Sequence, residues 1–423
     1  MTHALVEELE WRGLIAQMSD RQKLVDYLEG GQRTLYCGFD PTADSLHIGS
    51  LVPLLTLKRF QEAGHRPILL VGGATGLIGD PSFKDEERNL NDESIVAQWV
   101  ESIRRQAEPY LELEGNNPAI VANNLDWTQA LDVISFLRDV GKHFSVNAMI
   151  ARESVKQRLE RPDQGISYTE FSYMLLQGMD FLELAKRHDC LLQIGGSDQW
   201  GNIVSGVDLI RRQLAKEAHA VTLPLVTKAD GSKFGKTATG TVWLDAAKTS
   251  PYTFYQFWLN SADADVISYL KIFTFLSQAE IEQAAQSLAE QPQMREAQRL
   301  LAGDVTALVH GEQAVEAAQR ISESLFKNAP GELTQGDFEQ LHLDGIPNSE
   351  AQTGDGLLSA MADAGLTKSV GEARKLVQSG GVRLNGEVVE DPQMTLDFAA
   401  GYFGKYLLIR RGKKAYHLLT QAD

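Results

Sequence analysis

Residues 36–50 read YCGFDPTADSLHIGS, and an apolar segment lies on each side of them. The segment before them predicts a short strand, and residues 51–57, LVPLLTL, predict the start of a buried helix. Pro53 is tolerated there because the N–H groups of a first helical turn have no intrahelical partner. A strand, a turn with Gly and Pro and then a helix direct free N–H groups and a positive helix end towards a phosphate.

His47 adds a hydrogen-bond donor beside that helix end, and Gly49 lets a flat ring or a sugar lie against the backbone. A His-x-Gly turn by itself is most often an ordinary loop, but residues 230–237, DGSKFGKT, supply a second element. Lys233 and Lys236 lie three apart on a glycine-bearing loop, which suits the charge that builds on a departing pyrophosphate. Alone, that loop could equally be a solvated surface loop. The two elements together indicate a nucleotide site.

Other apolar segments also run into polar loops, as the strands of a parallel sheet covered on both faces do. Residues 67–71 lead into a glycine-rich stretch that ends near Asp80, and residues 190–194 lead through two glycines to Asp198. Open α/β sheets bind ligands at the carboxyl ends of their strands, where an acidic side chain can hold ribose hydroxyls. For Asp80 alone, a role as a helix cap fits the sequence about equally well. Two further strands are predicted over 120–124 and 221–226.

Residues 168–182 predict a helix that carries three polar residues on one face. Tyr173, Gln177 and Asp180 are spaced i, i+4 and i+7, which aligns their side chains. They could form the wet face of an amphipathic helix, but residues 174–182 are apolar on the other faces too, which favours burial. Buried polar groups are costly unless something satisfies them, and a small polar ligand could do so.

The composition, with 43% hydrophobic and 23% charged residues, is that of a globular protein. The N-terminus lacks the features of a signal peptide, and no apolar run approaches the roughly 20 residues that span a bilayer. Cys37 and Cys190 are the only cysteines, which suits a reducing compartment. We therefore expect a cytoplasmic protein with no membrane segment.

The charge is unevenly distributed along the chain. Residues 354–423 hold nine Lys and Arg against eight Asp and Glu, a balance of +1, so that residues 1–353 carry −18 of the net −17. A basic tail on an acidic body indicates one RNA-facing surface rather than general polyanion binding. The basic residues closest together in the tail are Lys405, Arg410, Arg411, Lys413 and Lys414.

The expected organisation has three domains. Residues 1–225 form a Rossmann-like α/β catalytic domain that begins with helices over 1–33 and contains an insertion at about 93–150. Residues 226–326 hold the lysine loop and an α-helical domain, residues 327–353 a linker, and residues 354–423 a small α+β domain. Within the last, residues 366–386 predict a capped helix, a glycine stop, a strand and an Asn-Gly turn.

The chain resembles the class I aminoacyl-tRNA synthetases, whose two signature motifs are similar to residues 47–50, HIGS, and 233–237, KFGKT. Residues 36–42, YCGFDPT, and the segments GDPS and GGSDQ resemble those of bacterial tyrosyl-tRNA synthetases. The similarity runs from about residue 30 to the C-terminus. The first motif usually ends in His, and Ser50 stands there instead; a hydroxyl can donate to a nucleotide but cannot supply a cationic donor. The second motif departs from the general Lys-Met-Ser-Lys-Ser form but keeps both lysines.

The resemblance implies an ATP-dependent ligase that activates tyrosine as the adenylate and transfers it to its tRNA. For tyrosine it implies contacts from Tyr36 and Asp180 to the hydroxyl and from Asp80, Tyr173 and Gln177 to the ammonium group, with Gln199 in the same site. For ATP it implies contacts from Cys37, Gly38, Asp40, His47, Gly49, Ser50, Gly196, Asp198 and Lys236, with Cys37 and Asp198 at the ribose. For stabilising the triphosphate in the transition state it implies Thr42, His47, Lys233, Lys236 and Thr237.

The resemblance also implies partners. These are tRNA(Tyr), L-tyrosine, ATP with its Mg²⁺, and a second copy of the chain, joined through the 93–150 insertion, while no protein-held metal is expected. The C-terminal segment is similar to a small RNA-binding module, in which we expect RNA contacts from Lys368, Arg374, Lys375, Arg383, Arg410 and Arg411. Three alternatives stay open: a tryptophanyl-tRNA synthetase, a non-catalytic RNA-binding paralogue, and another nucleotidyltransferase with the same type of sheet. Asp180 beside Tyr36 argues against the first, because an indole needs no hydroxyl partner.

Overall fold

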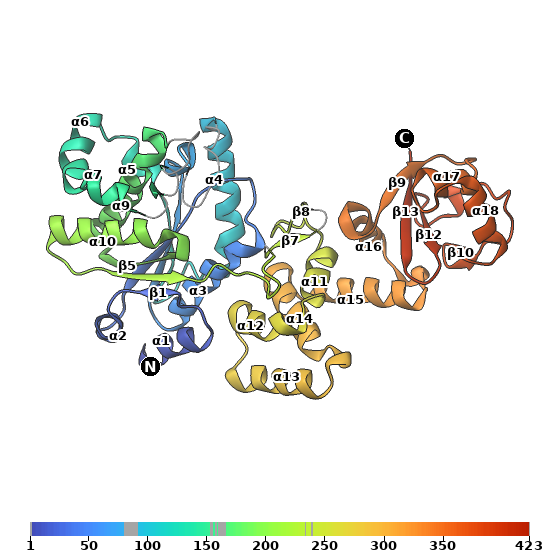
Figure 1. The fold of residues 1–423 in the computed structure, drawn as a ribbon, viewed down its shortest axis with the longest axis horizontal. Coiled ribbons are helices and arrows are strands. Elements are labelled where there is room, and N and C mark those ends of the chain that lie inside the picture. The colour runs from blue at the N-terminus through green and yellow to red at the C-terminus, as the bar shows by residue number, and fades with distance from the viewer. Residues whose placement is uncertain are drawn as a thin grey trace. The chain divides into compact units, whose positions relative to one another are not determined.

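The structure is a computed structural model that describes residues 2–79, 92–152, 155–156, 159, 166–232, 234–237 and 240–422. The chain forms two compact units (Figure 1). The first comprises Met1–Thr241 together with Ser268–Leu276, and the second comprises Val242–Ile267 and Ser277–Asp423.

The first unit is built on a six-stranded sheet in the order β1-β6-β5-β2-β3-β4. Its strands are β1 (Gln17–Met18), β2 (Thr34–Phe39), β3 (Arg66–Val71), β4 (Ile120–Asn123), β5 (Cys190–Gly196) and β6 (His219–Leu223). All neighbours run parallel except β1, which pairs antiparallel with β6 at the edge. The chain moves outward from β2 through β3 to β4 and returns to β5 on the other side of β2. The topological switch point, where such sheets bind ligands, therefore lies between β2 and β5. The predicted Rossmann-like class is confirmed.

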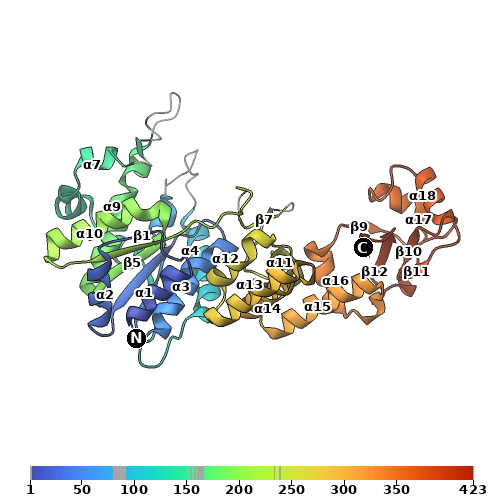
Figure 2. The same cartoon turned by 60° about the horizontal axis from the view of Figure 1, so that its bottom comes forward.

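Helices cover both faces of this sheet. Figure 2 shows α9 (Tyr168–His188) and α10 (Trp200–Leu214) on one face and α3 (Leu51–Glu62) on the other. A Cβ on Gly206 would lie 2.9 Å from the Phe181 ring, so glycine lets α9 and α10 pack closely. This packing holds the polar face of α9 against the strand ends. Further helices in the described part of the unit are α1 (Thr2–Trp11), α2 (Arg21–Glu29), α4 (Glu93–Ala107), α5 (Leu125–Thr128), α6 (Val133–Ser135) and α7 (Val146–Ile150).

The prediction of helices throughout residues 1–33 is wrong at one place. Gln17 and Met18 form β1, because their backbone pairs with Thr222 and Val221 of β6. The next helix, α2, begins at a side-chain cap, since the Asp20 side chain accepts a hydrogen bond from the Lys23 N–H group.

The helical part of the second unit agrees with the α-helical domain that was predicted within residues 226–326. It contains α11 (Pro251–Leu259), α13 (Gln278–Glu290), α14 (Glu296–His310) and α15 (Glu312–Lys327). The helix α12 (Asp263–Phe273) contributes its last residues to the first unit. The lysine loop also belongs to the first unit, whereas the sequence placed it with the helices.

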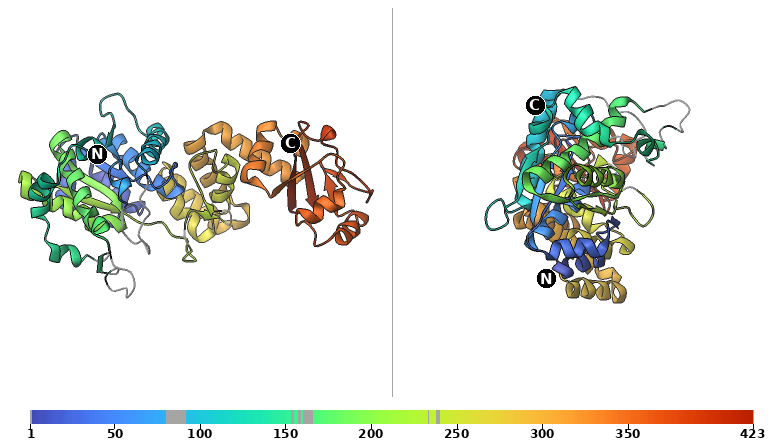
Figure 3. Two further views of the ribbon diagram at one scale, coloured as in Figure 1. Left: turned by 90° about the horizontal axis from the view of Figure 1, so that it is seen from above. Right: turned by 90° about the vertical axis from the view of Figure 1, so that its left-hand side faces the viewer.

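The C-terminal part of the second unit is a five-stranded sheet in the order β11-β10-β12-β13-β9, whose strands lie together in Figure 3 (left). Its elements are α16 (Gln335–Gln340), β9 (Asn348–Ala351), α17 (Leu357–Asp363), α18 (Val370–Gln378), β10 (Val382–Leu384), β11 (Glu387–Val388), β12 (Tyr406–Arg411) and β13 (Ala415–Gln421). The predicted helix, glycine stop, strand and turn are confirmed. Asn385 and Gly386 have φ of 52° and 93°, as a tight hairpin turn requires.

Residues 327–353, which were predicted to form a linker, contain regular secondary structure. The last residues of this segment form β9, which pairs parallel with β13, and its middle forms α16. A reciprocal cap between Thr334 and Asp337 starts that helix, and Phe338 is fully buried. Polar and Pro/Gly-rich composition suggested a linker, but strand pairing and one buried aromatic ring order the segment.

Candidate active site

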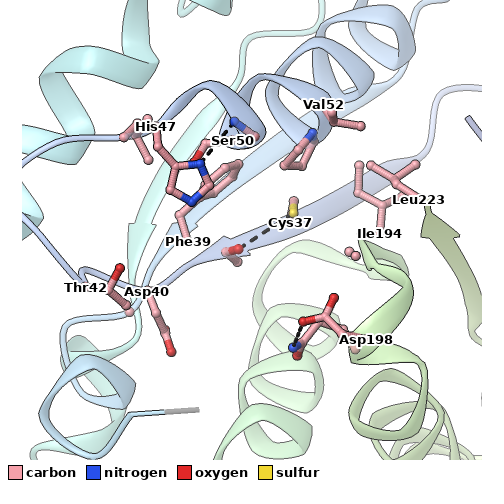
Figure 4. Close-up of a pocket in the computed structure, with 18 of the residues that line it drawn as sticks. Cys37, Phe39, Asp40, Thr42, His47, Ser50, Val52, Ile194, Asp198 and Leu223 are labelled. Atoms are coloured by element: carbon pink, nitrogen blue, oxygen red, sulfur yellow. Dashed lines mark hydrogen bonds between the residues drawn. The ribbon is translucent and has the colours of Figure 1, made fainter. Parts of the chain in front are cut away.

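A cavity of about 540 Å³ opens at the carboxyl ends of β2 and β5, at the switch point of the sheet. Figure 4 shows Asp40, Thr42 and His47 along one side of it and Ile194, Asp198 and Leu223 along the other. The structure brings together fifteen of the residues predicted for the site. These are Tyr36, Cys37, Gly38, Asp40, Thr42, His47, Gly49, Ser50, Tyr173, Gln177, Asp180, Gly196, Asp198, Gln199 and Lys236.

Three predicted residues are not among these. Asp80 and Lys233 lie outside the described residues. Thr237 belongs to the short strand β7 (Lys236–Thr237), which pairs with β8 (Gly240–Thr241), and its side chain lies outside the described part of the chain.

The deep end of the cavity holds a buried carboxylate. Asp180 of α9 is 3% exposed and accepts hydrogen bonds from Asn124 Nδ2 at 2.9 Å and Trp127 Nε1 at 2.8 Å, one on each oxygen. Burial raises the pKa of Asp180 to about 7, although both hydrogen bonds act against this rise. Burial and the nearby Asp180 carboxylate likewise raise the pKa of the Tyr36 hydroxyl well above its ordinary value.

A second network lies around Asp40, just after β2. Tyr173 donates from its hydroxyl to Asp40 Oδ2 at 2.5 Å, and Thr75 donates to Asp40 Oδ1 at 2.6 Å. A Cβ on Gly72 would lie 2.0 Å from Asp40 Oδ1, so only glycine leaves room for this arrangement. Asn124 joins the two networks, because its Nδ2 also donates to Thr75 Oγ1 at 2.9 Å.

Three buried polar atoms around the cavity have no hydrogen-bond partner in the described part of the chain. They are the Tyr36 hydroxyl, Gln177 Oε1 and Gln193 Oε1, and all three residues line the cavity. A buried polar group without a partner costs roughly 1–3 kcal/mol. A ligand that carries several polar groups on a compact body would satisfy them.

The first motif forms a short turn, η1 (Ile48–Ser50), ahead of α3. His47 Nδ1 accepts from the Gly49 N–H group at 3.0 Å, so the neutral ring carries its proton on Nε2, which can donate to a ligand. A Cβ on Gly49 would lie 2.9 Å from the His47 ring, and glycine therefore permits this ring position. Ser50 makes no side-chain cap bond to α3.

The opposite wall contains Cys37 and the loop after β5. Burial, helped by the Asp198 carboxylate, raises the pKa of the Cys37 thiol to about 12, so it is a neutral group. Gln199 Nε2 donates to Asp198 Oδ2 at 3.1 Å. A Cβ on Gly196 would lie 2.3 Å from Asp198 Oδ1, so glycine lets that carboxylate fold back over the strand end.

The lysine loop reaches the cavity from a third direction. Phe234 packs on Phe273 at a centroid distance of 5.3 Å with an 18° interplanar angle, and Lys236 is exposed and lines the cavity. Gly235 has φ of 77°, and a Cβ there would lie 2.7 Å from Ile48 Cγ2. The two motifs, almost two hundred residues apart, are thus in contact.

Sequence reasoning missed four residues of the site: Thr75, Asn124, Trp127 and Gln193. Thr75 lies in the glycine-rich stretch that follows residues 67–71, and a hydroxyl side chain among glycines after a strand is a usable signal. Asn124 and Trp127 follow β4 (Ile120–Asn123). Asn124 was predicted as the last residue of a strand over 120–124, and the argument used for Asp198 applies to a polar side chain at that strand end. Gln193 interrupts the apolar strand β5, and a polar residue inside such a strand is itself a signal.

The six residues expected to contact RNA divide into two groups. Lys368, just before α18, and Arg374 and Lys375 within it are exposed. The other three are half-buried arginines that donate to backbone oxygens: Arg383 to Gly386, Arg410 to Lys413 and Arg411 to Leu366. Cross-strand pairing places Arg383, Arg410 and Tyr416 in one row across the sheet.

The profile of the family described as "tRNA synthetases class I (W and Y)" matches residues 29–327. The chain belongs to this family. A second profile, "Tyrosine--tRNA ligase SYY-like C-terminal domain", matches residues 337–419, which include α16 and β9 of the segment expected as a linker.

The class I W and Y synthetases most similar to this chain include two bacterial proteins named Tyrosine--tRNA ligase. That of Chromobacterium violaceum is 58% identical over 420 residues, 98% of either chain. That of Klebsiella pneumoniae is 57% identical over 416 residues, 98% of this chain and 97% of its own. Among solved structures, a C-terminally truncated mitochondrial tyrosyl-tRNA synthetase of Aspergillus nidulans is 31% identical, with a TM-score of 0.69 over 76% of this chain and 94% of its own.

Proposed function

We propose that this chain is a tyrosine–tRNA ligase, which activates L-tyrosine with ATP and transfers it to the 3′ end of tRNA(Tyr). The observation that carries the substrate assignment is the deep end of the cavity. There the buried Asp180 carboxylate and the Tyr36 hydroxyl lie side by side in a site with several unsatisfied polar atoms. A phenol hydroxyl can donate to the carboxylate and accept from Tyr36, whereas an indole or a phenyl ring carries no hydroxyl and leaves the buried Tyr36 hydroxyl without an acceptor.

We assign the rest of the amino acid to the neighbouring groups. The ammonium group is held by Gln177 Oε1 and the Tyr173 hydroxyl, with Asp80 as the third partner and Gln199 beside them. Asp40, which accepts from Tyr173 and Thr75, fixes the Tyr173 ring in place. These contacts keep the substrate carboxylate directed towards the nucleotide.

In the first step, a tyrosine carboxylate oxygen attacks the α-phosphorus of ATP, the bond to the β-phosphate oxygen breaks, and pyrophosphate leaves with the electron pair. Such a displacement needs position and electrostatic stabilisation rather than a protein nucleophile. Cys37 and Asp198 hold the ribose, with Gly38, Gly49 and Gly196 leaving room for it. Thr42, the Nε2–H group of His47, Ser50, Lys233, Lys236 and Thr237 bind the charge that moves onto pyrophosphate. Mg²⁺ enters with ATP as part of the substrate.

In the second step, a ribose hydroxyl at the 3′ end of tRNA attacks the carbonyl carbon of tyrosyl-adenylate, and AMP leaves. The α-helical part of the second unit and the C-terminal domain are proposed to contact the tRNA. Exposed Lys368, Arg374 and Lys375 bind phosphates. Arg383, Arg410 and Arg411 position the loops of that surface, because their guanidinium groups are engaged with backbone oxygens.

We also propose a homodimer formed through the segment that follows β4. Exposed apolar side chains gather there: Val133, Ile134, Leu137, Val146, Ile150, Leu159 and Tyr168 are each more than 40% exposed. Such a concentration of apolar surface is typical of an interface. Both cysteines are unpaired and buried, which supports the proposed cytoplasmic location, and no helix in the described part of the chain is long and apolar enough to cross a membrane.

The test is amino-acid-dependent exchange of labelled pyrophosphate into ATP, with tyrosine, tryptophan, phenylalanine or no amino acid. Exchange with tyrosine alone is expected, followed by tyrosine charging of tRNA. Exchange with tryptophan would overturn the substrate but keep the mechanism. Absence of exchange with every amino acid, also after Ser50→His, would leave a non-catalytic RNA-binding protein.

A further inference from the structure

Two buried arginines hold the end of helix α12. Arg12, just after α1, donates to the carbonyl oxygens of Lys271, Thr274 and Leu276 at 3.0, 3.2 and 2.8 Å. Arg59 of α3 donates to the same Thr274 oxygen at 2.5 Å. The last carbonyls of a helix have no intrahelical partner and attract cations, so these arginines fix the position of the helix end.

Each arginine is itself firmly held. Both are 4% exposed, and Glu8 accepts from Arg12 Nε at 2.8 Å and lies 3.7 Å from Arg59 Nη1. The Arg59 guanidinium also lies over the Phe275 ring at 4.3 Å from its centroid. Two buried cations and one partly exposed carboxylate are a costly arrangement for stability alone.

The same helix end carries the anchor of the lysine loop. Phe234, the neighbour of Lys233, contacts Phe273 at 5.3 Å and Tyr269 at 5.2 Å between ring centroids. Tyr269 and Phe273 are 4% and 0% exposed, so the Phe234 ring is seated on buried residues. The position of the loop therefore follows the position of α12.

The contacts close into a ring. On one side, Gly235 of the lysine loop lies against Ile48, which precedes α3. On the other side, Arg59 of α3 binds Thr274 just after α12. Phe273 at the end of α12 then contacts Phe234 of the lysine loop. The ring thus joins the His47 turn and the lysine loop by two routes, one direct and one through the helices α3 and α12.

From this ring of contacts we propose that Arg59 and Arg12 are positioning residues for the transition state, because they set the lysine loop at its distance from His47. The inference rests on the proposed ligase function and adds residues outside the cavity to it. Tyrosine binding does not depend on the ring, since Asp180 belongs to α9 and the groups around it belong to β2 and to the segment from Asn124 to Trp127. Charge stabilisation of the departing pyrophosphate does depend on it, and small displacements of such groups cost up to about 100-fold in rate.

The test is quenched-flow measurement of tyrosyl-adenylate formation in a single turnover, which separates the plateau rate from tyrosine affinity. The variants are Arg59→Met, which removes the bond to Thr274, Arg59→Lys, which keeps the charge, and Phe234→Ala. Arg33→Met is the matched control. Arg33 also donates to a backbone oxygen, that of Tyr27 at 2.6 Å, and lies over the Tyr27 ring at 4.7 Å, so its side chain is held against α2 instead of the end of α12.

The expected result is a plateau rate about tenfold lower or more for Arg59→Met and Phe234→Ala, with tyrosine affinity within about twofold. Arg59→Lys should recover part of the rate, and Arg33→Met should keep it even where its melting temperature falls. A double variant that combines Arg59→Met with Phe234→Ala should be no slower than the slower of the two single variants, because both substitutions act through the same chain of contacts.

A plateau rate preserved in Arg59→Met, or losses that multiply in the double variant, would overturn the proposal. If Arg59→Met does not fold, Arg59→Lys with Phe234→Ala provides the same comparison. Failure of the wild-type protein to form tyrosyl-adenylate would instead contradict the proposed function itself.

Discussion

The two ends of the cavity differ in how far their side chains are buried. At the tyrosine end, Asp180 and Tyr36 are 3% and 1% exposed, and Asp180 is held by Asn124 and Trp127. At the phosphate end, His47, Thr42 and Lys236 are exposed and stand on turns with glycines. Selecting an amino acid requires rigid, desolvated groups that are left unpaired by the wrong substrate. Stabilising a leaving group requires charges that can follow it, and loops provide this.

The largest effect is expected from the phosphate end. Lys236→Met should lower the rate of tyrosine-dependent pyrophosphate exchange by about 100-fold or more, because a charge is lost where the leaving group develops its own. Lys228→Met, on the same segment but outside the cavity lining, is the control and should change little. A loss of only a fewfold in Lys236→Met would mean that the loop does not act on the transition state.

The next effect concerns selectivity at the tyrosine end. Asp180→Asn should lower the preference for tyrosine over phenylalanine, measured as the ratio of kcat/KM in exchange, by about 10- to 100-fold, since the buried hydrogen bond to the phenol is weakened. The preference should survive if the phenol instead contacts only Tyr36, and this outcome would remove Asp180 from the account.

A smaller effect distinguishes two adjacent residues at the end of β4, Asn123 and Asn124. Asn124→Ala removes a hydrogen-bond donor to Asp180 and therefore about 1–3 kcal/mol of stabilisation of that carboxylate. The affinity for tyrosine should fall as a result. Asn123→Ala removes a carbonyl that accepts from Gly73 and Leu125 but does not touch Asp180. It should lower the melting temperature and leave tyrosine affinity unchanged, as isothermal titration can establish.

The last effect concerns stability rather than catalysis, and it depends on pH. Because burial raises the pKa of Asp180 to about 7, its ionised form is disfavoured in the folded protein. The contribution of Asp180 to stability is therefore complete below the unfolded pKa, near 4, and is lost as pH rises through about 7, at up to roughly 1.4 kcal/mol per pH unit. Chemical denaturation of wild type and Asp180→Asn from pH 5 to 8 should show this slope in the wild type alone. Parallel profiles would contradict it.

The sequence predicted features that depend on neighbours along the chain. The spacing of Tyr173, Gln177 and Asp180 fixes one helix face whatever lies opposite, and the glycines at 49 and 196 follow from local turns. What it could not predict depends on pairing between distant segments. Asn124 and Trp127 are more than fifty residues from Asp180. The strands β1 and β9 form because they pair with β6 and β13. Local composition contains no record of these partners.

The most direct test of the account is the tyrosine dependence of single-turnover adenylate formation in wild type, Asp180→Asn and Lys236→Met. We predict that Asp180→Asn raises the tyrosine concentration at half-saturation and leaves most of the plateau rate, while Lys236→Met lowers the plateau and leaves half-saturation unchanged. If each variant moved both quantities to a similar extent, the division between a rigid selecting end and an adaptable phosphate end would be wrong.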